Sequence, residues 1–154
     1  MTEPPHPPFA VRFRSTGICQ KEFRRGEKLG VIAYNPLMSG LLTGKHSRGM
    51  AAPGSRLADS PEYRQRYWSE ENFNAAEECR KIAEKAGMTP VELALRWCAH
   101  QPGIDSVLLG ASRESHLTPN MSAILGPPLP KDMAEACDQV WAHMSVGTRY
   151  RYYR

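Results

Sequence analysis

The sequence predicts a helix-rich α/β fold with about two parallel strands covered by helices. Two short apolar runs have the length of strands, and the segments between and after them repeat apolar residues at helical spacing. Parallel neighbours in a sheet need a crossover of a dozen or more residues, which those helical segments provide. Because a sheet of two parallel strands covers neither of its edges, we expect the chain to form part of a larger fold.

The composition is that of one ordinary globular domain. The chain has 154 residues, of which 41% are apolar and 23% are charged, and both fractions are normal. No run of residues approaches the roughly 18 apolar residues of a membrane helix. The first residues lack the apolar core of a secretory signal. We therefore expect a cytoplasmic protein without a membrane partner.

The four cysteines indicate neither a disulfide framework nor a metal site. Cys19, Cys79, Cys98 and Cys137 lie far apart in the sequence, and no histidine stands near them at metal spacing. Free cysteine is commonly buried as a small hydrophobic residue. We expect four reduced cysteines with a structural role and no bound metal.

The net charge of +4 is concentrated at the two ends of the chain. Residues 1–28 carry six basic and three acidic side chains, residues 148–154 carry three basic ones, and the remainder carries eleven basic and thirteen acidic ones. A basic surplus limited to the ends is typical of a solvated arm and tail. We therefore do not expect the chain to bind nucleic acid.

The first 28 residues are predicted to be a poorly ordered arm. They are rich in proline at the start and basic afterwards, and they show neither strand nor helix periodicity. Val31–Tyr34 is then an apolar run of strand length, which Asn35-Pro36 ends. The segment from Asn35 to about Trp68 holds several glycines and prolines. We expect it to be a long loop that serves as a binding loop or a lid.

Two helices are predicted to follow this loop. Ser69 is a candidate N-cap for the first helix and Gly87 is its candidate end. The apolar stripe of this helix consists of Phe73, Ala76, Cys79, Ala83 and Ala86. Thr89-Pro90-Val91-Glu92 combines a capping box with a proline at the first helical position. A second helix is therefore expected to run to about His100, with a buried side made of Leu93, Ala94, Trp97 and Cys98.

A second strand and a final helix complete the pattern. Ser106–Leu109 is too short for a helix and is followed at once by Gly110-Ala-Ser112. This order predicts a strand that leads into a turn of the size that holds a phosphate. The last helix is expected to follow Pro130. Its apolar face consists of Met133, Ala136, Cys137, Val140, Trp141 and Met144.

Two segments carry a resemblance to a known family. The segment GVIAYNPLMSGLLTGK, from Gly30 to Lys45, resembles the seventh strand and following loop of aldo-keto reductases. The segment SVLLGASRESHLTPN, from Ser106 to Asn120, resembles the eighth strand and short helix of the same family. The pieces between them that follow in family order and spacing are Gly54–Arg56, Arg66–Trp68 and Ala94–Trp97. The similarity is greatest to the branches that contain aflatoxin aldehyde reductases and potassium-channel β subunits.

The resemblance covers roughly Leu29 to Arg154 and implies both a fold and a cofactor. The fold would be the C-terminal fragment of a TIM (β/α)8 barrel. Residues 1–28 would be the arm, and residues 29–154 would form a partial barrel from strand seven to the C-terminal helix and tail. The cofactor would be NADP(H), bound at the C-terminal ends of the barrel strands, where sites of this fold lie.

The resemblance assigns the first group of cofactor contacts to the first strand and its loop. Tyr34 would stack on the nicotinamide, although a tyrosine packed in the core is the alternative. The segment that would supply backbone N–H groups and small side chains near the pyrophosphate consists of Asn35, Pro36, Leu37, Met38 and Ser39. An ordinary turn is the alternative there. Lys45 and Arg56 would bind phosphate oxygens or else be solvated cations of the loop.

The second group of contacts follows the second strand. Gly110, Ser112 and Arg113 lead into a helix start, which favours an anion. The resemblance gives Ser112 and Arg113 the adenosine 2′-phosphate, and therefore favours NADP(H) over NAD(H). His116 would lie near the same phosphate and Asn120 would contact the adenine. The alternatives are a plain helix cap for Ser112 and surface positions for Arg113 and His116.

Pro119 departs from the family pattern, because relatives have an acidic or amide residue there. Proline inside a helix removes a backbone hydrogen bond and crowds the preceding turn. We therefore expect the helix to begin afresh at Thr118-Pro119, with Thr118 as its cap. Such a break would shift both His116 and Asn120.

The residues that the family uses for catalysis are outside this sequence. In aldo-keto reductases a tyrosine, assisted by a lysine, an aspartate and a histidine, donates the proton, and all four belong to the first half of the barrel. We therefore assign no catalytic residue and expect no turnover by the chain alone. Its partners would be NADP(H) and either a protein that supplies the missing strands or a second copy of the chain.

Three functional hypotheses agree with these residues. The chain is the NADP(H)-binding part of an aldehyde or ketone reductase, a non-catalytic module that senses NADP(H) or regulates a partner, or the product of a truncated gene. All three retain the same cofactor residues, so the motifs alone do not separate them.

Overall fold

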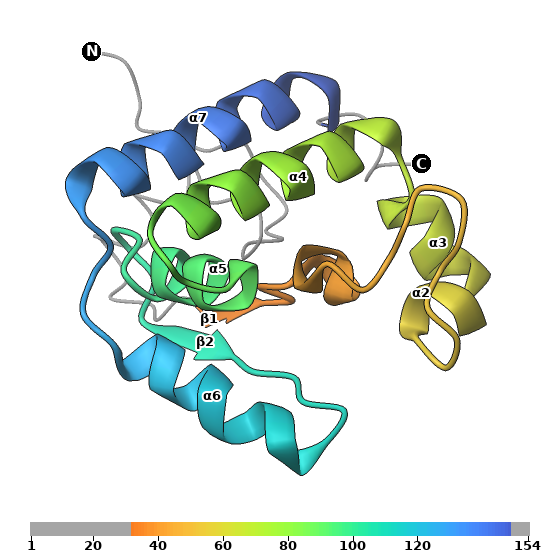
Figure 1. The fold of residues 1–154 in the computed structure, drawn as a ribbon, viewed down its shortest axis with the longest axis horizontal. Coiled ribbons are helices and arrows are strands. Elements are labelled where there is room, and N and C mark those ends of the chain that lie inside the picture. The colour runs from red at the N-terminus through yellow and green to blue at the C-terminus, as the bar shows by residue number, and fades with distance from the viewer. Residues whose placement is uncertain (1–31, 149–154) are drawn as a thin grey trace, which may run out of the picture.

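The computed structural model describes residues 32–148, with side chains up to His143 (Figure 1). The elements along the chain are β1 (Ile32–Tyr34), the 3-10 helix η1 (Met38–Thr43), α2 (Arg56–Asp59), α3 (Pro61–Tyr67), α4 (Glu70–Lys85), α5 (Pro90–Ala99), β2 (Ser106–Leu108), α6 (Glu114–Leu125) and α7 (Lys131–Thr148). The predicted arm at residues 1–28 lies outside the described residues, as does Val31.

The two strands pair in parallel, as predicted. Ile32 is opposite Ser106 and Tyr34 is opposite Leu108 in the ladder. One face of this small sheet is buried, because Ala33 is fully enclosed and packs with Cys98, Ile104 and Val107. The other face is open: Ile32 is 58% exposed and Leu108 is 63% exposed. Such a two-stranded sheet with one uncovered face is what a piece of a larger barrel presents.

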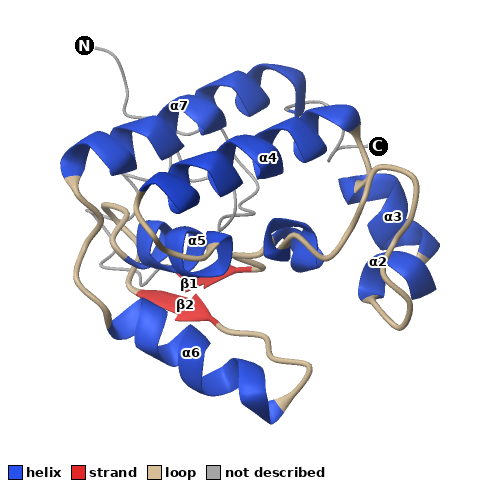
Figure 2. Ribbon diagram, viewed as in Figure 1, coloured by secondary structure: helices blue, strands red, loops and turns tan. Residues whose placement is uncertain are grey.

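The helices are stacked on the buried face of the sheet (Figure 2). α4 and α7 lie side by side as the outer layer, and α5 lies between α4 and the sheet. α6 packs against α5 beside β2, whereas α2 and α3 contact η1 at the other end of the molecule. The fold is helix-rich and contains two parallel strands, as expected for part of a (β/α)8 barrel.

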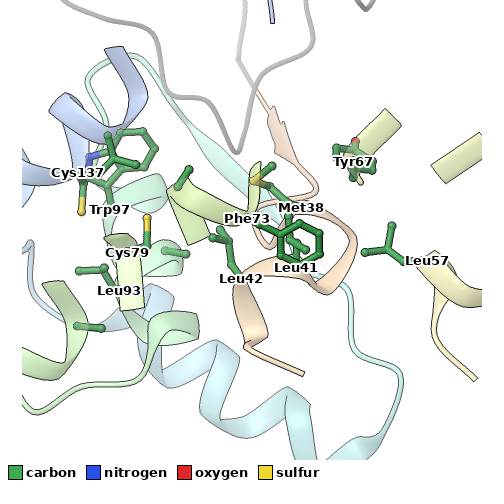
Figure 3. Close-up of a cluster of buried hydrophobic side chains, with 14 of the residues drawn as sticks. Met38, Leu41, Leu42, Leu57, Tyr67, Phe73, Cys79, Leu93, Trp97 and Cys137 are labelled. Atoms are coloured by element: carbon green, nitrogen blue, oxygen red, sulfur yellow. The ribbon is translucent and has the colours of Figure 1, made fainter. Parts of the chain in front are cut away.

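One hydrophobic cluster joins η1 to the helix layers (Figure 3). Leu42, Leu57 and Leu93 are each at most 1% exposed in it, and η1 contributes Met38 and Leu41 as well. The indole of Trp97 on α5 donates a hydrogen bond of 3.0 Å to Asp138 on α7. Burial of aliphatic side chains together with this one polar contact therefore ties the central helix to the outer layer.

The ends of α4 and α5 agree with the sequence signals. The Ser69 and Thr89 hydroxyls accept hydrogen bonds from the N–H groups of Asn72 and Glu92, which satisfies donors that a helix start leaves free. Gly87 has a φ of 65° just past the end of α4, where glycine is favoured. The prediction that Ala86 belongs to the apolar stripe of α4 is wrong, because Ala86 is exposed at the C-cap of the helix.

The prediction that Asn35 to Trp68 form one long irregular loop is wrong. This part of the chain holds η1, α2 and α3 in place of one irregular segment. The Ser55 hydroxyl caps α2 by accepting from the N–H of Ala58, and Pro61 opens α3. These are ordinary helix start signals, but the glycines and prolines around them dominated the prediction.

The predicted break at Pro119 is also wrong. α6 runs without interruption from Glu114 to Leu125 with Pro119 inside it. Proline removes only the one bond that its own N–H would have donated to the Ser115 carbonyl. Both residues are exposed, so water can reach this turn of the helix. In a smaller difference, β2 ends at Leu108, one residue earlier than expected.

The position of Leu42 generates a stability prediction. Leu42→Ala removes a side chain that is 1% exposed between η1 and the helices, and we expect the free energy of unfolding to fall by about 2–5 kcal/mol. Urea unfolding followed by circular dichroism measures this loss. Met50→Ala, at a side chain that is 65% exposed, is the matched control and should change it by less than about 0.5 kcal/mol. Equal losses in the two variants would mean that η1 is not part of the core.

Candidate functional site

Most of the predicted site residues lie on or near two turns at one edge of the sheet. Tyr34 and Leu108 are register partners at the ends of β1 and β2. Because the strands are parallel, the turn that begins at Asn35 and the turn that begins after Leu108 leave the sheet at the same edge. In α/β folds this carboxyl edge is where ligands bind. The ring of Tyr34 is 36% exposed and belongs to the open face of the sheet.

The turn after β1 has an unusual backbone. Asn35, Met38 and Ser39 have φ angles of 56°, 50° and 57°, in the left-handed region that costs a residue other than glycine about 1 kcal/mol or more. The side chains of Pro36 and Met38 are buried and that of Leu37 is partly buried against the core. Of the predicted residues here, these three therefore serve the core with their side chains and can offer a ligand only backbone atoms.

The N–H groups of this turn are partly used within the turn itself. The N–H of Met38 donates to the carbonyl of Asn35 at 3.1 Å, and the N–H of Ser39 donates to the side-chain oxygen of Asn35 at 2.7 Å. The sequence predicts that the N–H groups of this segment face a pyrophosphate. In the conformation described, two of them stabilise the turn.

Lys45 lies against this turn. A Cβ atom added to Gly40, whose φ is 93°, would stand 3.1 Å from Lys45 Cε and 3.2 Å from Nζ. The same position is 3.6 Å from His46 Nε2. Glycine at this place therefore lets an ammonium group and an imidazole approach the backbone closely.

His46 is a further candidate residue beside this turn, and it is not among the residues predicted from the sequence. Its Nδ1 accepts a hydrogen bond of 3.1 Å from the N–H of Ala52, so the neutral ring carries its proton on Nε2. Burial, and then the neighbouring Lys45, lower the pKa of His46 below its usual 6.5. Two buried atoms, Nε2 of His46 and Oγ of Ser39, have no hydrogen-bond partner within the described part of the chain. The one signal in the sequence was the position of His46 directly after Lys45.

The turn after β2 is open in comparison. Gly110, Ser112 and Arg113 are exposed, and Arg113 occupies the N-cap position of α6 without a side-chain cap. Ser112 is therefore not the cap that the alternative interpretation gave it. Its hydroxyl lies 3.4 Å from Nδ1 of the exposed His116. The uncapped start of a helix of twelve residues favours a negative charge beside these side chains.

Two predicted residues lie apart from these turns. Asn120 is only 5% exposed, on the side of α6 that packs toward α5. Arg56 is exposed on α2, and its guanidinium lies 5.1 Å from the centre of the Tyr63 ring. In Figure 1, α2 lies at the right of the molecule beside α3, and α6 lies at the bottom below β2. The structure thus brings together Tyr34 to Ser39 with Lys45, and Ser112 with His116, but it leaves Arg56 on the outer segment.

A groove of about 320 Å³ on the helical side is a weaker candidate. Its lining includes His46, Arg48, Phe73, Glu77, Arg80 and Pro90. The cations are already paired, since Arg48 contacts Glu70 and Arg80 contacts both Glu77 and Glu84. An anion would have to displace these carboxylates, so the edge of the sheet is the better anion site.

The described cysteines are structural. Cys79, Cys98 and Cys137 are free and buried, and burial raises the pKa of each thiol to about 12. They are protonated at neutral pH and therefore poor nucleophiles. Cys19 lies outside the described residues. Within residues 32–148 no group of side chains is arranged to hold a metal ion, and no helix has the length and apolarity to cross a membrane.

Comparisons with known proteins agree on one family. A model described as the aldo/keto reductase family matches residues 16–142. An aldo-keto reductase of Pseudocercospora fijiensis is 32% identical over 130 residues, which are 78% of this chain and 44% of that protein. A probable voltage-gated potassium channel subunit beta of Arabidopsis thaliana is 35% identical over 103 residues, which are 66% and 31% of the two chains.

A solved structure extends the agreement to the fold. The glycerol dehydrogenase of Gluconobacter oxydans superposes with a TM-score of 0.62 at 27% identity, covering 82% of this chain and 39% of that one. The chain therefore spans less than half the length of the relatives named here. The predicted resemblance and the predicted partial barrel are both confirmed.

The lowered pKa of His46 generates a prediction about pH. Because the folded chain keeps the ring neutral where the unfolded chain protonates it, the free energy of unfolding falls as the pH drops through 6.5. Urea unfolding above and below that pH should show a smaller fall in the free energy of unfolding for His46→Asn than for the wild type. The side-chain oxygen of this asparagine can still accept the hydrogen bond from the N–H of Ala52. His100→Asn, at an exposed position, is the control and should keep the wild-type loss. A wild-type loss in His46→Asn as well would exclude His46 as its source.

Proposed function

The chain belongs to the aldo/keto reductase family, and from this membership we propose that it is the NADP(H)-binding C-terminal portion of a reductase that acts on aldehydes or ketones. The observation that carries the proposal is the pair of turns at one edge of the sheet, each with features that suit a phosphate. We further propose that the chain is inactive by itself, because the proton-donating tetrad of the family belongs to strands outside this sequence.

The turn after β1 suits the pyrophosphate. Lys45 brings a positive charge to the backbone at Gly40, and His46 Nε2 and Ser39 Oγ lie unpaired beneath the surface, with no partner in residues 32–148. A buried polar atom without a hydrogen bond costs about 1–3 kcal/mol. The ammonium group would attract a phosphate, whose oxygen would remove that cost by accepting from either atom once the turn makes that atom accessible.

The turn after β2 suits the 2′-phosphate of NADP(H). Ser112 and Arg113 stand exposed at the uncapped start of α6, where free N–H groups and the helix dipole favour an anion. NAD(H) has no phosphate at that position, so these side chains would favour NADP(H). His116, which lies beside Ser112, would join them. We propose, from the family resemblance alone, that Asn120 contacts the adenine.

The remaining assignments follow the resemblance in the same way. The partly exposed ring of Tyr34 on the open sheet face would lie against the nicotinamide. Arg56 would reach a phosphate only after α2 moves over the turn, since its guanidinium now stacks on Tyr63. When bound, NADP(H) would supply the hydride chemistry. The residues of this chain bind and orient the cofactor.

The open surfaces indicate a partner. Besides the exposed sheet face, α6 carries an exposed apolar stripe made of Leu117, Met121 and Leu125, which are 42%, 47% and 79% exposed. These residues recur every four positions and so lie along one side of the helix. We propose that the N-terminal strands and helices of a barrel cover both surfaces. A second copy of this chain is the alternative.

A second candidate function is a module that senses NADP(H) or regulates a partner without catalysis. The similarity to proteins named as potassium channel beta subunits favours it. A truncated gene product that binds nothing is the third. Turnover of an aldehyde after addition of an N-terminal barrel portion would favour the reductase, and NADPH binding without such turnover would favour the module.

NADPH titration tests the cofactor assignment. We expect NADPH fluorescence to change saturably with added protein. Arg113→Ala should weaken NADPH binding about tenfold or more, since it removes a charge-assisted hydrogen bond, and should leave NADH binding unchanged. Arg64→Ala, at an exposed arginine on α3, is the matched control and should bind NADPH like the wild type. No saturable binding below millimolar NADPH would contradict the proposal.

Co-expression tests the partner assignment. We expect the chain to co-purify with the portion of the Gluconobacter oxydans glycerol dehydrogenase that it does not cover. The triple variant Leu117→Glu, Met121→Glu and Leu125→Glu should lose this association, because it places charges in the interface. These positions are exposed, so the variant should unfold like the wild type. Met50→Glu is the control for an exposed apolar side chain elsewhere and should still associate. Co-purification of the triple variant would show that another surface is used.

A further inference from the structure

A chain of hydrogen bonds joins the turn after β1 to two helices that lie far along the sequence. The side-chain amide of Asn72 on α4 donates to the carbonyl of Tyr67 at 2.9 Å. The amide of Asn35 donates to the Tyr67 hydroxyl at 2.8 Å, and the side-chain oxygen of Asn35 accepts from the N–H of Ser39 at 2.7 Å. We name the contact between the Asn35 amide and the Tyr67 hydroxyl the Asn35–Tyr67 clamp.

Burial gives the clamp its rigidity. Asn72 is 2% exposed and Tyr67 is 7% exposed, and the Tyr67 ring stacks on Tyr63 with centroids 6.1 Å apart. Water has little access to these groups, so the protein bonds are not readily exchanged for bonds to solvent. The position of the Tyr67 hydroxyl is therefore set by α3 and α4.

The clamp also fixes the side chain of Asn35. Both ends of its amide group are engaged, the nitrogen by Tyr67 and the oxygen by Ser39. Asparagine tolerates a left-handed backbone better than most residues, and a bond from its own side chain to the turn favours that conformation further. The left-handed angles at Asn35, Met38 and Ser39 are thus held by contacts that end at Tyr67.

We infer that Tyr67 is a positioning residue for the cofactor turn, an inference that rests on the proposed function. Through Asn35 it holds residues 35–40 in the shape that places Gly40 under Lys45 and leaves Ser39 Oγ unpaired. Tyr67 lies at the end of α3, so the α2 and α3 segment is coupled to the pyrophosphate half of the site. The adenosine half, on β2 and α6, has no part in this chain of bonds.

The two halves can be separated with two ligands. Tyr67→Phe removes only the hydroxyl, and Asn35→Gly keeps the left-handed backbone but removes both side-chain bonds. Each variant should weaken NADPH binding about two- to tenfold and leave the binding of adenosine 2′-monophosphate, which lacks the pyrophosphate, unchanged. The double variant Tyr67→Phe, Asn35→Gly should bind NADPH no more weakly than the single variant with the lower affinity, since both substitutions remove the Asn35–Tyr67 clamp. Tyr63→Phe, the stacked neighbour, is the control and should bind both ligands like the wild type.

Amide hydrogen exchange without ligand tests the inference independently of cofactor binding. Amide hydrogen exchange at Met38, Ser39 and Gly40 should be faster in Tyr67→Phe than in the wild type, whereas exchange in α5 should be unchanged. Unchanged exchange at the turn would overturn the inference, as would equal weakening of the binding of NADPH and of adenosine 2′-monophosphate. If the wild type binds no NADPH, the proposed function fails, and faster exchange in Tyr67→Phe would still support the clamp.

Discussion

The burial of α5 is the constraint on which the rest of the structure depends. Leu93, Leu95 and Cys98 are at most 1% exposed, and the helix contacts α4, η1, β2 and α6. Trp97 adds a hydrogen bond to α7. Because α5 contacts both β2 and η1, its packing helps to position the two elements beside which the turns lie. Both turns of the candidate site are thus placed by the packing of a helix that contributes no residue to it.

The two turns have different physical character. The first is closed, since its left-handed backbone, internal hydrogen bonds and contact with Tyr67 hold it in one shape. The second is exposed and ends at an uncapped helix start. If the proposed function holds, the closed turn would receive the pyrophosphate and the accessible helix start would receive the 2′-phosphate, so that only one end of the cofactor site would have to be organised in advance.

Much of the fold could be predicted from the sequence, because its signals are local. The caps at Ser69 and Thr89, the end at Gly87 and the parallel strands are all found where they were expected. The short helices α2 and α3 could not be recognised among the surrounding glycines and prolines. The prediction of a helix break at Pro119 gave too much weight to the loss of one backbone hydrogen bond. The Asn35–Tyr67 contact spans 32 residues, and the unpaired His46 Nε2 depends on which atoms surround it. The contact has no local signal in the sequence, and the only local signal for His46 is its position directly after Lys45.

The full enclosure of Ala33 has a consequence for how the chain finds its strand alignment. Ala33 is fully enclosed and packs with Cys98 on the buried face of the sheet. A slip of one residue along the ladder would turn either Ile32 or Tyr34 into that space, and all strand side chains would exchange faces. The small side chain of Ala33 therefore favours one register of β1 against β2. This register in turn sets the position of the turn after β1 relative to the turn after β2.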